Sequence, residues 1–538
     1  MNVKYSFPSR RSAVMSRGGM VATSQPLAAQ AGVEMLWRGG NAIDAAVATA
    51  AALNVVEPMS TGLGGDAFAL IYLAKSRELK ALNASGRSPY AATPEAYRKM
   101  GCRQMPEKGI HAVTVPGTLD GWCRLLESHG TMSLGQVLAP AIKLAEDGFP
   151  VTEIISHTWE KQRGLLEQDA GAARVYLPEG RAPGAGEVVV QAELAETLKK
   201  IARGGRDVFY RGEIAGVIAD CALKHGGLLN KRDLAEHTST WVTPISTGYR
   251  GYDVYQCPPN GQGLVTLLAL NILAGYDLPS LGHNSAEYLH LLIEALKLGF
   301  ADAEKYVADP DFADIPLREL LSAPYAEKQR RRIDEGKAGE KVAAGAPETD
   351  GDTVYLATSD GEGNSVSFIN SLYQAFGSGI VVEGTGICLQ NRGALFSLEE
   401  GHRNVLEPHK RPYHTIIPGM VFKDGELFLT FGVMGGFMQP QGHVQLLLNI
   451  IDFGMDVQTA LDAPRFRYYH QNNACAFEKG ISPEARQALT GKGHHIVEPD
   501  DPYSQDFGGG QAIMRHPGSQ ALIAGSDPRK DGGAIGTW

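Results

Sequence analysis

A threonine at the joint between a polar segment and a strand is the first residue of this sequence that could act as a nucleophile. Thr353 follows a run rich in Gly, Ala, Lys and Glu (335–351), whose composition predicts a flexible loop. After Thr353 come two alternating apolar runs separated by Asp-Gly-Glu-Gly-Asn (360–364), which is a hairpin signal. The pattern alone is satisfied by a turn followed by an edge strand, so a catalytic interpretation needs a chemical argument.

A threonine hydroxyl is a weak nucleophile unless a base lies beside it, and one solution is the residue's own α-amine. The pKa of an α-amine is about 7.7–8.0, so much of it is an available base near neutral pH. Thr353 is internal and has no free amine. Nucleophilic chemistry therefore requires a cut between Asp352 and Thr353, which would leave the fragments 1–352 and 353–538.

Gly351-Asp352-Thr353 and the hairpin after it resemble the γ-glutamyltransferase family of N-terminal-nucleophile (Ntn) hydrolases. The likeness runs from about residue 18 to the C-terminus, and further stretches carry it in the family's order, among them Pro258–Gly263, Gly432–Pro440 and Ser526–Ala534. The resemblance implies an α/β fold, a four-layer αββα sandwich. It also implies one domain over 1–538, self-cleaved into a large subunit (1–352) and a small subunit (353–538), with no cofactor.

The resemblance assigns roles to five residues. Ser371 falls where the family has a hydroxyl that hydrogen-bonds the nucleophile Thr353. Gly435 and Gly436 fall in the paired-glycine loop, whose backbone amides are expected to form the oxyanion hole; glycine lets backbone approach the tetrahedral oxygen closely. Arg87 falls where the family binds the substrate's carboxylate, a task that suits a bidentate guanidinium.

Other positions depart from the family. Where glutamyl-specific members use Asn, Gln and Asp to bind the substrate's amino and carboxylate groups, this chain has Tyr373, Arg392 and Leu395. The two nearby serines of the family become His414 and Thr415. A leucine cannot accept hydrogen bonds from an ammonium group. We therefore expect these positions to select a substrate other than a γ-glutamyl amine.

Arg87 and Arg392, aligned without an acidic partner, favour an anionic acyl group that lacks an amine. The segment between Arg392 and His414 is shorter than the family's lid-bearing loop, which favours hydrolysis over transfer. The sequence thus predicts a self-processing amide hydrolase acting on a small carboxylate-bearing substrate of the oxamate or glutaryl type, similar to the oxamate amidohydrolase and cephalosporin acylase branch. Two alternatives stay open: a γ-glutamyltransferase or glutathione hydrolase, and a catalytically silent binding scaffold.

Composition limits the remaining classes. The 538 residues are 43% hydrophobic and 20% charged, as in soluble globular proteins, and the net charge of −10 argues against nucleic-acid binding. The basic run 328–332 is flanked by acids and is predicted to be a solvated helix face. Six scattered cysteines signal neither a disulfide framework nor a zinc site. We expect a cytoplasmic protein without a membrane segment, whose partners are a small-molecule amide and its own two fragments, with a dimer of such pairs left open.

Two histidine positions and several elements complete the expectations. His494 and His495 are adjacent strand residues whose side chains point to opposite faces, so no metal is predicted; His290 is interpreted as a packed or capping histidine. The predicted elements are the hairpin Ala67–Ala74 and Glu78–Asn83, the helices Leu119–Ser128, Ser133–Glu146, Leu264–Ala274 and Ser285–Val307, and one strand at Tyr249–Tyr255.

Overall fold

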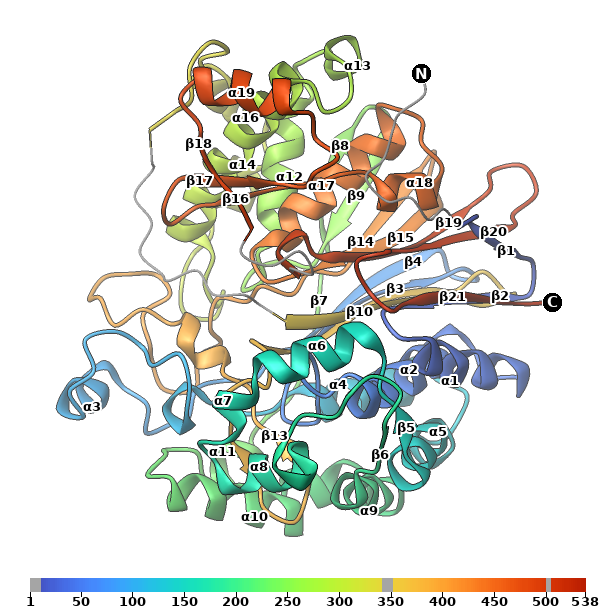
Figure 1. Cartoon of the computed structure of the whole chain (residues 1–538), viewed down its shortest axis with the longest axis vertical. Helices are drawn as coiled ribbons and strands as arrows, with labels where there is room; N and C mark the ends of the chain where they lie inside the picture. The colour runs from blue at the N-terminus through green and yellow to red at the C-terminus, as the bar shows by residue number, and fades with distance from the viewer. Residues whose placement is uncertain (1–10, 341–351, 500–504) are drawn as a thin grey trace.

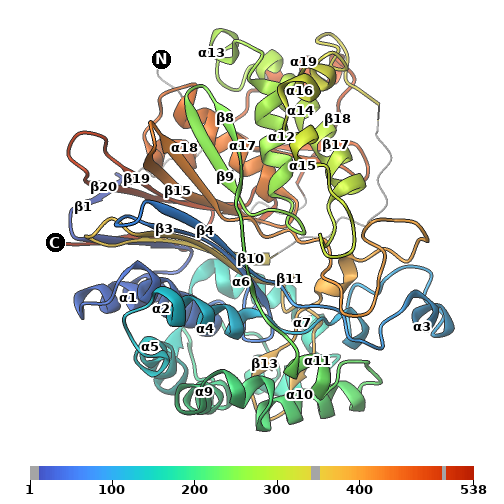
Figure 2. The same ribbon diagram turned by 180° about the vertical axis from the view of Figure 1, so that it is seen from behind.

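Two antiparallel β-sheets lie face to face between layers of helices (Figures 1 and 2). The structure, a computed structural model, describes residues 11–340, 352–499 and 505–538. Most of the loop predicted at 335–351 lies outside the described residues. The predicted four-layer α/β sandwich is confirmed, because helices cover the outer face of each sheet.

The first sheet contains seven described strands, from edge to edge β1 (Val14–Ser16), β20 (Leu522–Ser526), β19 (Gly509–Arg515), β15 (Glu426–Met434), β14 (Gly419–Lys423), β9 (Tyr252–Gln256) and β8 (Ile245–Tyr249). The second contains seven more, in the order β21 (Gly533–Thr537), β2 (Gly19–Thr23), β10 (Asp352–Ser359), β11 (Ser365–Tyr373), β3 (Asp66–Leu73), β4 (Glu78–Ala84) and β7 (Thr240–Val242). Each sheet contains strands from both sides of the proposed cut. The two fragments would therefore share both sheets of one fold.

Helices on the outer face of the second sheet are α1 (Pro26–Trp37), α2 (Ala42–Val56), α4 (Thr118–His129), α5 (Leu134–Asp147) and α9 (Ala192–Tyr210). Those on the outer face of the first sheet are α12 (Gly263–Leu273), α14 (Ala286–Tyr306), α16 (Ala323–Arg330), α17 (Met438–Ile451) and α18 (Val457–Asp462). The four helices and the hairpin predicted from sequence are confirmed to within two residues at each end.

Shorter elements connect these layers. The helices are α3 (Pro94–Lys99), α6 (Glu153–Lys161), α7 (Arg163–Leu166), α8 (Ala170–Tyr176), α10 (Glu213–Lys224), α11 (Lys231–Ala235), α13 (Leu278–Leu281), α15 (Leu317–Leu320) and α19 (Pro483–Gly491). The strands are β5 (Phe149–Pro150), β6 (Val188–Val189), β12 (Val381–Val382), β13 (Ile387–Cys388), β16 (Phe466–Tyr469), β17 (Ala474–Phe477) and β18 (His495–Val497).

Side chains of β10 alternate between two hydrophobic cores. Val354 and Leu356 are fully buried in the core under α1 and α2, whereas Tyr355 and Ala357 are buried in the core between the two sheets. This period of two is what a central strand requires. Because each face of β10 is packed, its register, and with it the position of Thr353 at its start, is strongly specified.

One element was predicted wrongly. Tyr249–Tyr255 is not one strand but the hairpin of β8 and β9, whose turn is formed by Arg250 and Gly251. Both turn residues have positive φ, at 50° and 82°. Such a two-residue turn matches the twist of the flanking strands. Because arginine seldom adopts left-handed backbone, the sequence did not indicate a turn at Arg250.

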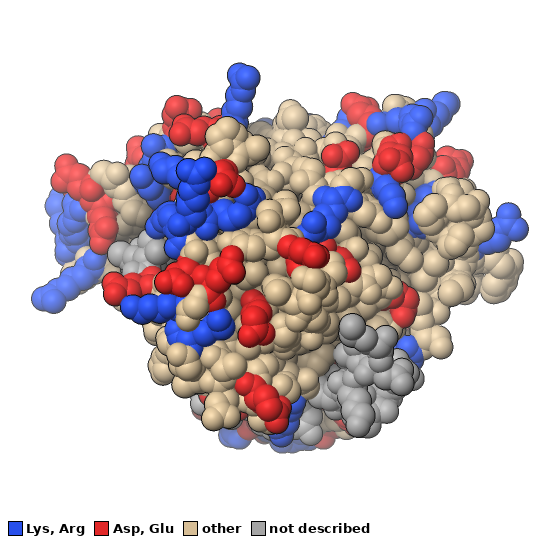
Figure 3. Space-filling view, turned by 90° about the horizontal axis from the view of Figure 1, so that it is seen from above, with Lys and Arg blue, Asp and Glu red and all other residues tan. Residues whose placement is uncertain are grey.

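Charged side chains of both signs are interspersed on the face shown in Figure 3. The basic run 328–332 lies at the end of α16, where Arg330 and Arg331 both pair with Glu327. Lys328, Arg331 and Arg332 are exposed, whereas Gln329 is buried and Arg330 donates to the carbonyl of Ile272, so the predicted solvated face is confirmed only in part. Among the described helices, none has the length and apolar character needed to cross a bilayer.

We predict that Gly86→Ala destabilises the protein strongly. A Cβ atom on Gly86 would lie 1.5 Å from the carbonyl oxygen of Val115, which is backbone and cannot rotate away. We expect a loss of about 3 kcal/mol or more, seen as a lower melting temperature. Gly164→Ala in α7 is the matched control, since nothing lies within 4 Å of its added Cβ. Equal melting temperatures for the two variants would contradict the predicted clash.

Candidate active site

Thr353 lies at a β-bulge between β10 and β11. Asp352 pairs with Tyr373 and Val354 pairs with Asn370, so two residues of β11 face the single residue Thr353. One of them, Ser371, has its Oγ 3.1 Å from the Oγ1 of Thr353. Bulges re-aim side chains at the ends of strands. This bulge brings the two hydroxyls together, in a position where both residues are fully buried.

Two further donors surround the Ser371 hydroxyl. The Oγ of Ser371 accepts from the amide of Tyr373 at 2.7 Å and from Nη2 of Arg392 at 3.0 Å. A hydroxyl has two acceptor lone pairs and one proton. Either hydroxyl of the Thr353–Ser371 pair can donate the hydrogen bond between them.

Arg392 is the charged group next to this pair. Its Nη1 donates to Oγ1 of Thr415 at 2.6 Å, its guanidinium lies over the ring of Tyr373 at 4.6 Å, and it is fully buried. None of the carboxylates that the structure describes pairs with it, and its Nε has no partner among the described residues. Burial lowers the pKa of Arg392 to about 10, so the group stays charged at neutral pH.

Tyr373 is held in strained backbone at the end of β11. Its φ is +83°, a region that bulky side chains rarely adopt. This conformation lets its amide reach Ser371 while its ring packs on Arg392. Outliers of this kind persist where the surroundings over-determine them, often at functional sites. The predicted positions Thr353, Ser371, Tyr373, Arg392 and Thr415 thus form one connected group.

His414 faces away from this group, toward Asp66. Its Nε2 is 3.1 Å from Oδ2 of Asp66, at the start of β3. The other oxygen of Asp66 accepts from the amides of Gly86 and Gly117 and from Nε2 of Gln390. Burial lowers the pKa of His414 to about 4, with a further contribution from the charge of Arg392. His414 is therefore a neutral imidazole that donates to a carboxylate, a role that the sequence did not indicate.

Arg87 lies on the far side of Asp66, next to Gly86. Its Nη1 donates to the carbonyl of Thr238 at 3.4 Å, and the residue is 8% exposed. The expectation that it has no acidic partner was wrong: Nη2 is 3.8 Å from Oδ2 of Asp311. That pair is long, and the Asp311 side chain is 67% exposed, so water screens it. None of the contacts described for Arg87 joins it directly to Thr353, Ser371 or Arg392; Gly86, next to it in the chain, donates to Asp66, which contacts His414.

The glycine pair follows β15 and precedes α17. Gly435 and Gly436 have φ of +121° and +57°, which only glycine adopts readily in sequence. Neither amide donates a hydrogen bond to another described residue, so both are available to a ligand. The N-terminal end of α17 adds partial positive charge. Such an arrangement suits an oxyanion hole.

Packing between the sheets places this loop near Thr353. A Cβ on Gly432 would lie 2.3 Å from the ring of Tyr355, so β10 and β15 approach each other closely here. Tyr355 is two residues after Thr353, and Gly432 is three residues before Gly435. Gln262, just before α12, then ties the loop to the Arg392 group. Its Nε2 donates to the carbonyls of Gly436 and Thr415, at 2.9 and 2.7 Å. Gln262 lies within the stretch 258–263 that carries the family resemblance, and the sequence indicated no role for its side chain.

A cavity of about 250 Å³ opens beside the site. Its wall includes Leu395, Tyr413 and Phe437. In the chain these residues lie close to Arg392, His414 and Gly436, respectively. Its other lining residues are mixed in character, with Phe300, Phe396 and Leu398 beside polar groups such as Glu304, His402 and Asn404. At the position of the family's Asp, Leu395 therefore presents an apolar surface, as expected.

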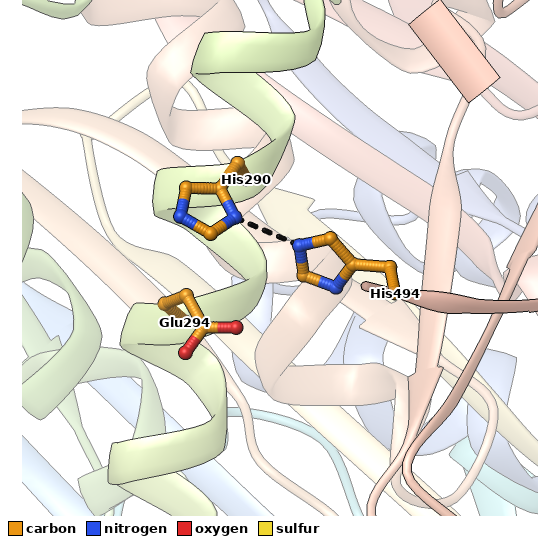
Figure 4. Close-up of side chains that lie close together, drawn as sticks. All are labelled: His290, Glu294 and His494. Carbon is orange, nitrogen blue, oxygen red and sulfur yellow. Dashed lines mark hydrogen bonds between the residues drawn. The ribbon is translucent and has the colours of Figure 1, made fainter. Parts of the chain in front are cut away.

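A second polar cluster joins the two predicted fragments outside the site (Figure 4). His290 and Glu294 of α14 lie with His494 so that possible ligand atoms are all within 4.8 Å of one another. The two imidazoles share a 2.8 Å hydrogen bond, and the carboxylate accepts from Lys297 and from the amide of Gly339. His290 is a packed histidine, as interpreted. His494 lies just before β18 and is buried, whereas His495 begins the strand and is exposed, so the prediction that both are strand residues was wrong for His494.

The depressed pKa of His414 predicts acid sensitivity of folding. The unfolded chain binds a proton near the ordinary pKa of 6.5, whereas the folded protein does so only near 4. The unfolded state then holds more protons between these values, so stability is full above pH 6.5 and falls as pH drops toward 4. In His414→Gln, we expect this slope to shrink by about 1.4 kcal/mol per pH unit.

Denaturant unfolding of the parent and of His414→Gln between pH 5 and 7 measures this slope. His495→Gln is the control, since its side chain is exposed, and it should retain the parent's slope. An unchanged slope in His414→Gln would assign the acid sensitivity to other groups.

Comparisons with known proteins give the family. The gamma-glutamyltranspeptidase family model matches residues 28–537. The chain is 41% identical to the glutathione hydrolase-like YwrD proenzyme of Bacillus subtilis, over 96% of this chain and 98% of that one. It is 34% identical to the oxamate amidohydrolase proenzyme of Klebsiella pneumoniae, over 97% and 99%. The crystal structure of cephalosporin acylase from Bacillus halodurans superposes with a TM-score of 0.93 at 46% identity, covering 99% and 98%. This chain therefore belongs to the gamma-glutamyltranspeptidase family of Ntn hydrolases.

Proposed function

We propose that the protein cuts itself between Asp352 and Thr353 and then hydrolyses the amide of a small carboxylate-bearing substrate. The observation that carries this proposal is the buried hydroxyl pair of Thr353 and Ser371, 3.1 Å apart at the start of β10. The cut would place a free α-amine on the same residue as the reactive hydroxyl. The proenzyme names of the relatives support self-processing.

In the proposed cycle, the α-amine of Thr353 takes the hydroxyl proton while Oγ1 forms a bond to the substrate's carbonyl carbon. The amides of Gly435 and Gly436 stabilise the resulting oxyanion, and such donors are worth about 2.7–4 kcal/mol each. Collapse of the intermediate breaks the C–N bond, and the proton passes to the departing amine. Water then attacks the ester with the α-amine as base, which releases the acid and restores Thr353.

Charge at the site supports a carboxylate substrate. Arg392 is buried without a contacting carboxylate, and Leu395 offers no acceptor for an ammonium group. A guanidinium repels an ammonium and pairs with a carboxylate. An acyl group of the oxamate or glutaryl type fits this arrangement, with Arg392 and Arg87 as the carboxylate partners and Tyr373, His414 and Thr415 forming their surroundings.

A γ-glutamyl enzyme is the second candidate, because relatives at an identity comparable to that of the oxamate amidohydrolase are named glutathione hydrolase proenzymes. It predicts activity on glutathione, whose α-ammonium group would lie beside Arg392. Rates on glutathione, oxamate and a glutaryl amide, measured on the same preparation, separate the two. A catalytically silent scaffold would act on none of the three.

Intact-mass analysis tests the nucleophile. The parent should split into fragments of residues 1–352 and 353–538, while Thr353→Ala stays whole because it lacks the attacking hydroxyl. N-terminal sequencing of the smaller fragment should begin at Thr353. A parent that remains one polypeptide yet hydrolyses amides would overturn the proposal.

Removal of the Ser371 hydroxyl should slow both reactions without unfolding the protein. Ser371→Ala deletes the hydrogen bond to Thr353 and one of Arg392's partners. Loss of a hydrogen bond to a charge-developing group corresponds to about a 10- to 100-fold fall in kcat. Ser371→Thr keeps a hydroxyl and should retain more activity than the alanine variant. Equal rates for the serine, threonine and alanine forms would exclude the assigned role.

A further inference from the structure

Three buried side chains from distant parts of the chain meet outside the candidate active site (Figure 4). His290 and Glu294 lie four residues apart in α14, so both side chains project from one face of the helix. His494 comes from the segment just before β18. The three residues are 1%, 5% and 4% exposed, and their possible ligand atoms all lie within 4.8 Å of one another. Imidazole and carboxylate are groups that bind divalent metal ions in proteins.

A backbone carbonyl orients His290 within this cluster. Nε2 of His290 lies 2.8 Å from the carbonyl oxygen of Asp334, which can only accept, so Nε2 carries the proton. In the neutral imidazole, Nδ1 then presents a lone pair to the cluster, 2.8 Å from Nε2 of His494. Metal-binding histidines are oriented in the same manner, since a carbonyl that accepts from one ring nitrogen fixes the other toward the metal.

His494 is held by that one hydrogen bond. Its other ring nitrogen, Nδ1, is buried without a partner among the described residues. An ion placed between the two rings would replace the contact of Nε2 with His290. It would cost the His494 ring no other hydrogen bond that the structure describes.

The carboxylate of Glu294 retains acceptor capacity. Oε1 accepts from Nζ of Lys297 at 2.8 Å, and Oε2 accepts from the amide of Gly339 at 3.1 Å. Each carboxylate oxygen has two lone pairs, so the contacts described leave one on each oxygen for an ion. Lys297 also offsets the charge of Glu294, so the cluster lacks the surplus of anionic oxygen that suits Ca²⁺. Two imidazoles and one carboxylate suit Zn²⁺ instead.

The spacing of these three side chains fits one ion after small movements. Zinc binds nitrogen and carboxylate oxygen at about 2.0–2.2 Å, so neighbouring ligand atoms of a tetrahedral ion lie roughly 3.4 Å apart. The ring nitrogens would therefore separate slightly from 2.8 Å, and the carboxylate would move inward by side-chain rotation. No fourth His, Cys, Asp or Glu among the described residues joins the group, which leaves the fourth position to water.

The chain segments on either side of this cluster already lie side by side. The amide of Ala338 donates to the carbonyl of Lys492 at 2.8 Å, and Nζ of Lys492 donates to the carbonyl of Glu335 at 2.7 Å. The two segments belong to opposite sides of the proposed cut. An ion bound by α14 and the segment before β18 would therefore cross-link the two fragments.

We propose that His290, Glu294 and His494 bind a divalent transition-metal ion of the zinc class, which has a structural role. The ion joins α14 to the segment before β18, away from the hydroxyl pair of Thr353 and Ser371. The site depends neither on the cut nor on amide hydrolysis, because all three ligands are present in the uncut chain.

Zinc titration of the full chain, prepared without a histidine tag, tests the proposal. After treatment with a chelator and dialysis, calorimetry with ZnCl2 should show one tight site per chain, and zinc should raise the melting temperature. Glu294→Gln and His494→Gln should each bind zinc at least about 100-fold more weakly, since changes that only reorient a ligand cost about 10- to 100-fold. His495→Gln is the matched control, because its side chain is exposed beside a ligand, and it should bind as the parent does.

Cobalt provides a readout that is independent of stability. Co²⁺ should give the visible absorption of a tetrahedral site in the parent and in His495→Gln, and this absorption should be lost in both ligand variants. If His494→Gln does not fold, Glu294→Gln decides, because glutamine keeps the size of the side chain and removes only its charge.

The outcomes separate this inference from the proposed function. A parent that binds neither zinc nor cobalt would overturn the inference, and so would equal zinc affinity in the parent and the ligand variants. Thr353→Ala, which is expected to stay uncut, should bind zinc as the parent does. A parent that neither splits nor hydrolyses amides would overturn the proposed function and leave the metal site standing.

Discussion

Burial of the Arg392 guanidinium beside two hydroxyl groups is the constraint on which this site depends. A fully buried cation without a contacting carboxylate is unfavourable in low dielectric. Three neighbours offset that cost: the hydroxyls of Ser371 and Thr415, and the ring of Tyr373. Because each must be held in place, the surrounding fold has to be rigid at this point.

The stacked sheets supply that rigidity. Thr353 and Ser371 come from adjacent central strands of one sheet, whereas the glycine pair ends a central strand of the other. Each strand is packed on both faces, so its side chains have little freedom to shift. Thr353, Ser371 and the glycine pair lie at strand ends. There the bulge at Thr353 and the turn after β15 interrupt the regular pairing of the backbone. A catalytic arrangement built on strands rather than on loops can hold hydrogen-bond geometry without an ordering cost at the moment of reaction.

The proposed difference between this chain and a γ-glutamyl enzyme is one of charge at the substrate positions. Side chains that accept hydrogen bonds stabilise a substrate's ammonium group, whereas a guanidinium cation repels it. Here Leu395 stands at the position aligned with the family's acceptor, and Arg392 donates to Ser371, which lies beside the proposed nucleophile Thr353. Relatives named for glutathione, oxamate and cephalosporin share the fold at high coverage, so the fold alone does not choose among them. We propose that side chains at a few positions carry that choice.

Local pattern by itself determined a large part of this protein. The strand that contains Thr353, the hairpin after it and the amphipathic helices all follow from backbone preference and periodicity, which act over a few residues. The turn at Arg250 was not predicted, because arginine does not normally adopt left-handed backbone. Only tertiary structure decided that Asp66 meets His414 and that Gln262 links Gly436 to Thr415. These contacts join residues more than 150 positions apart, and they exist because two sheets pack face to face, which no short stretch of sequence specifies.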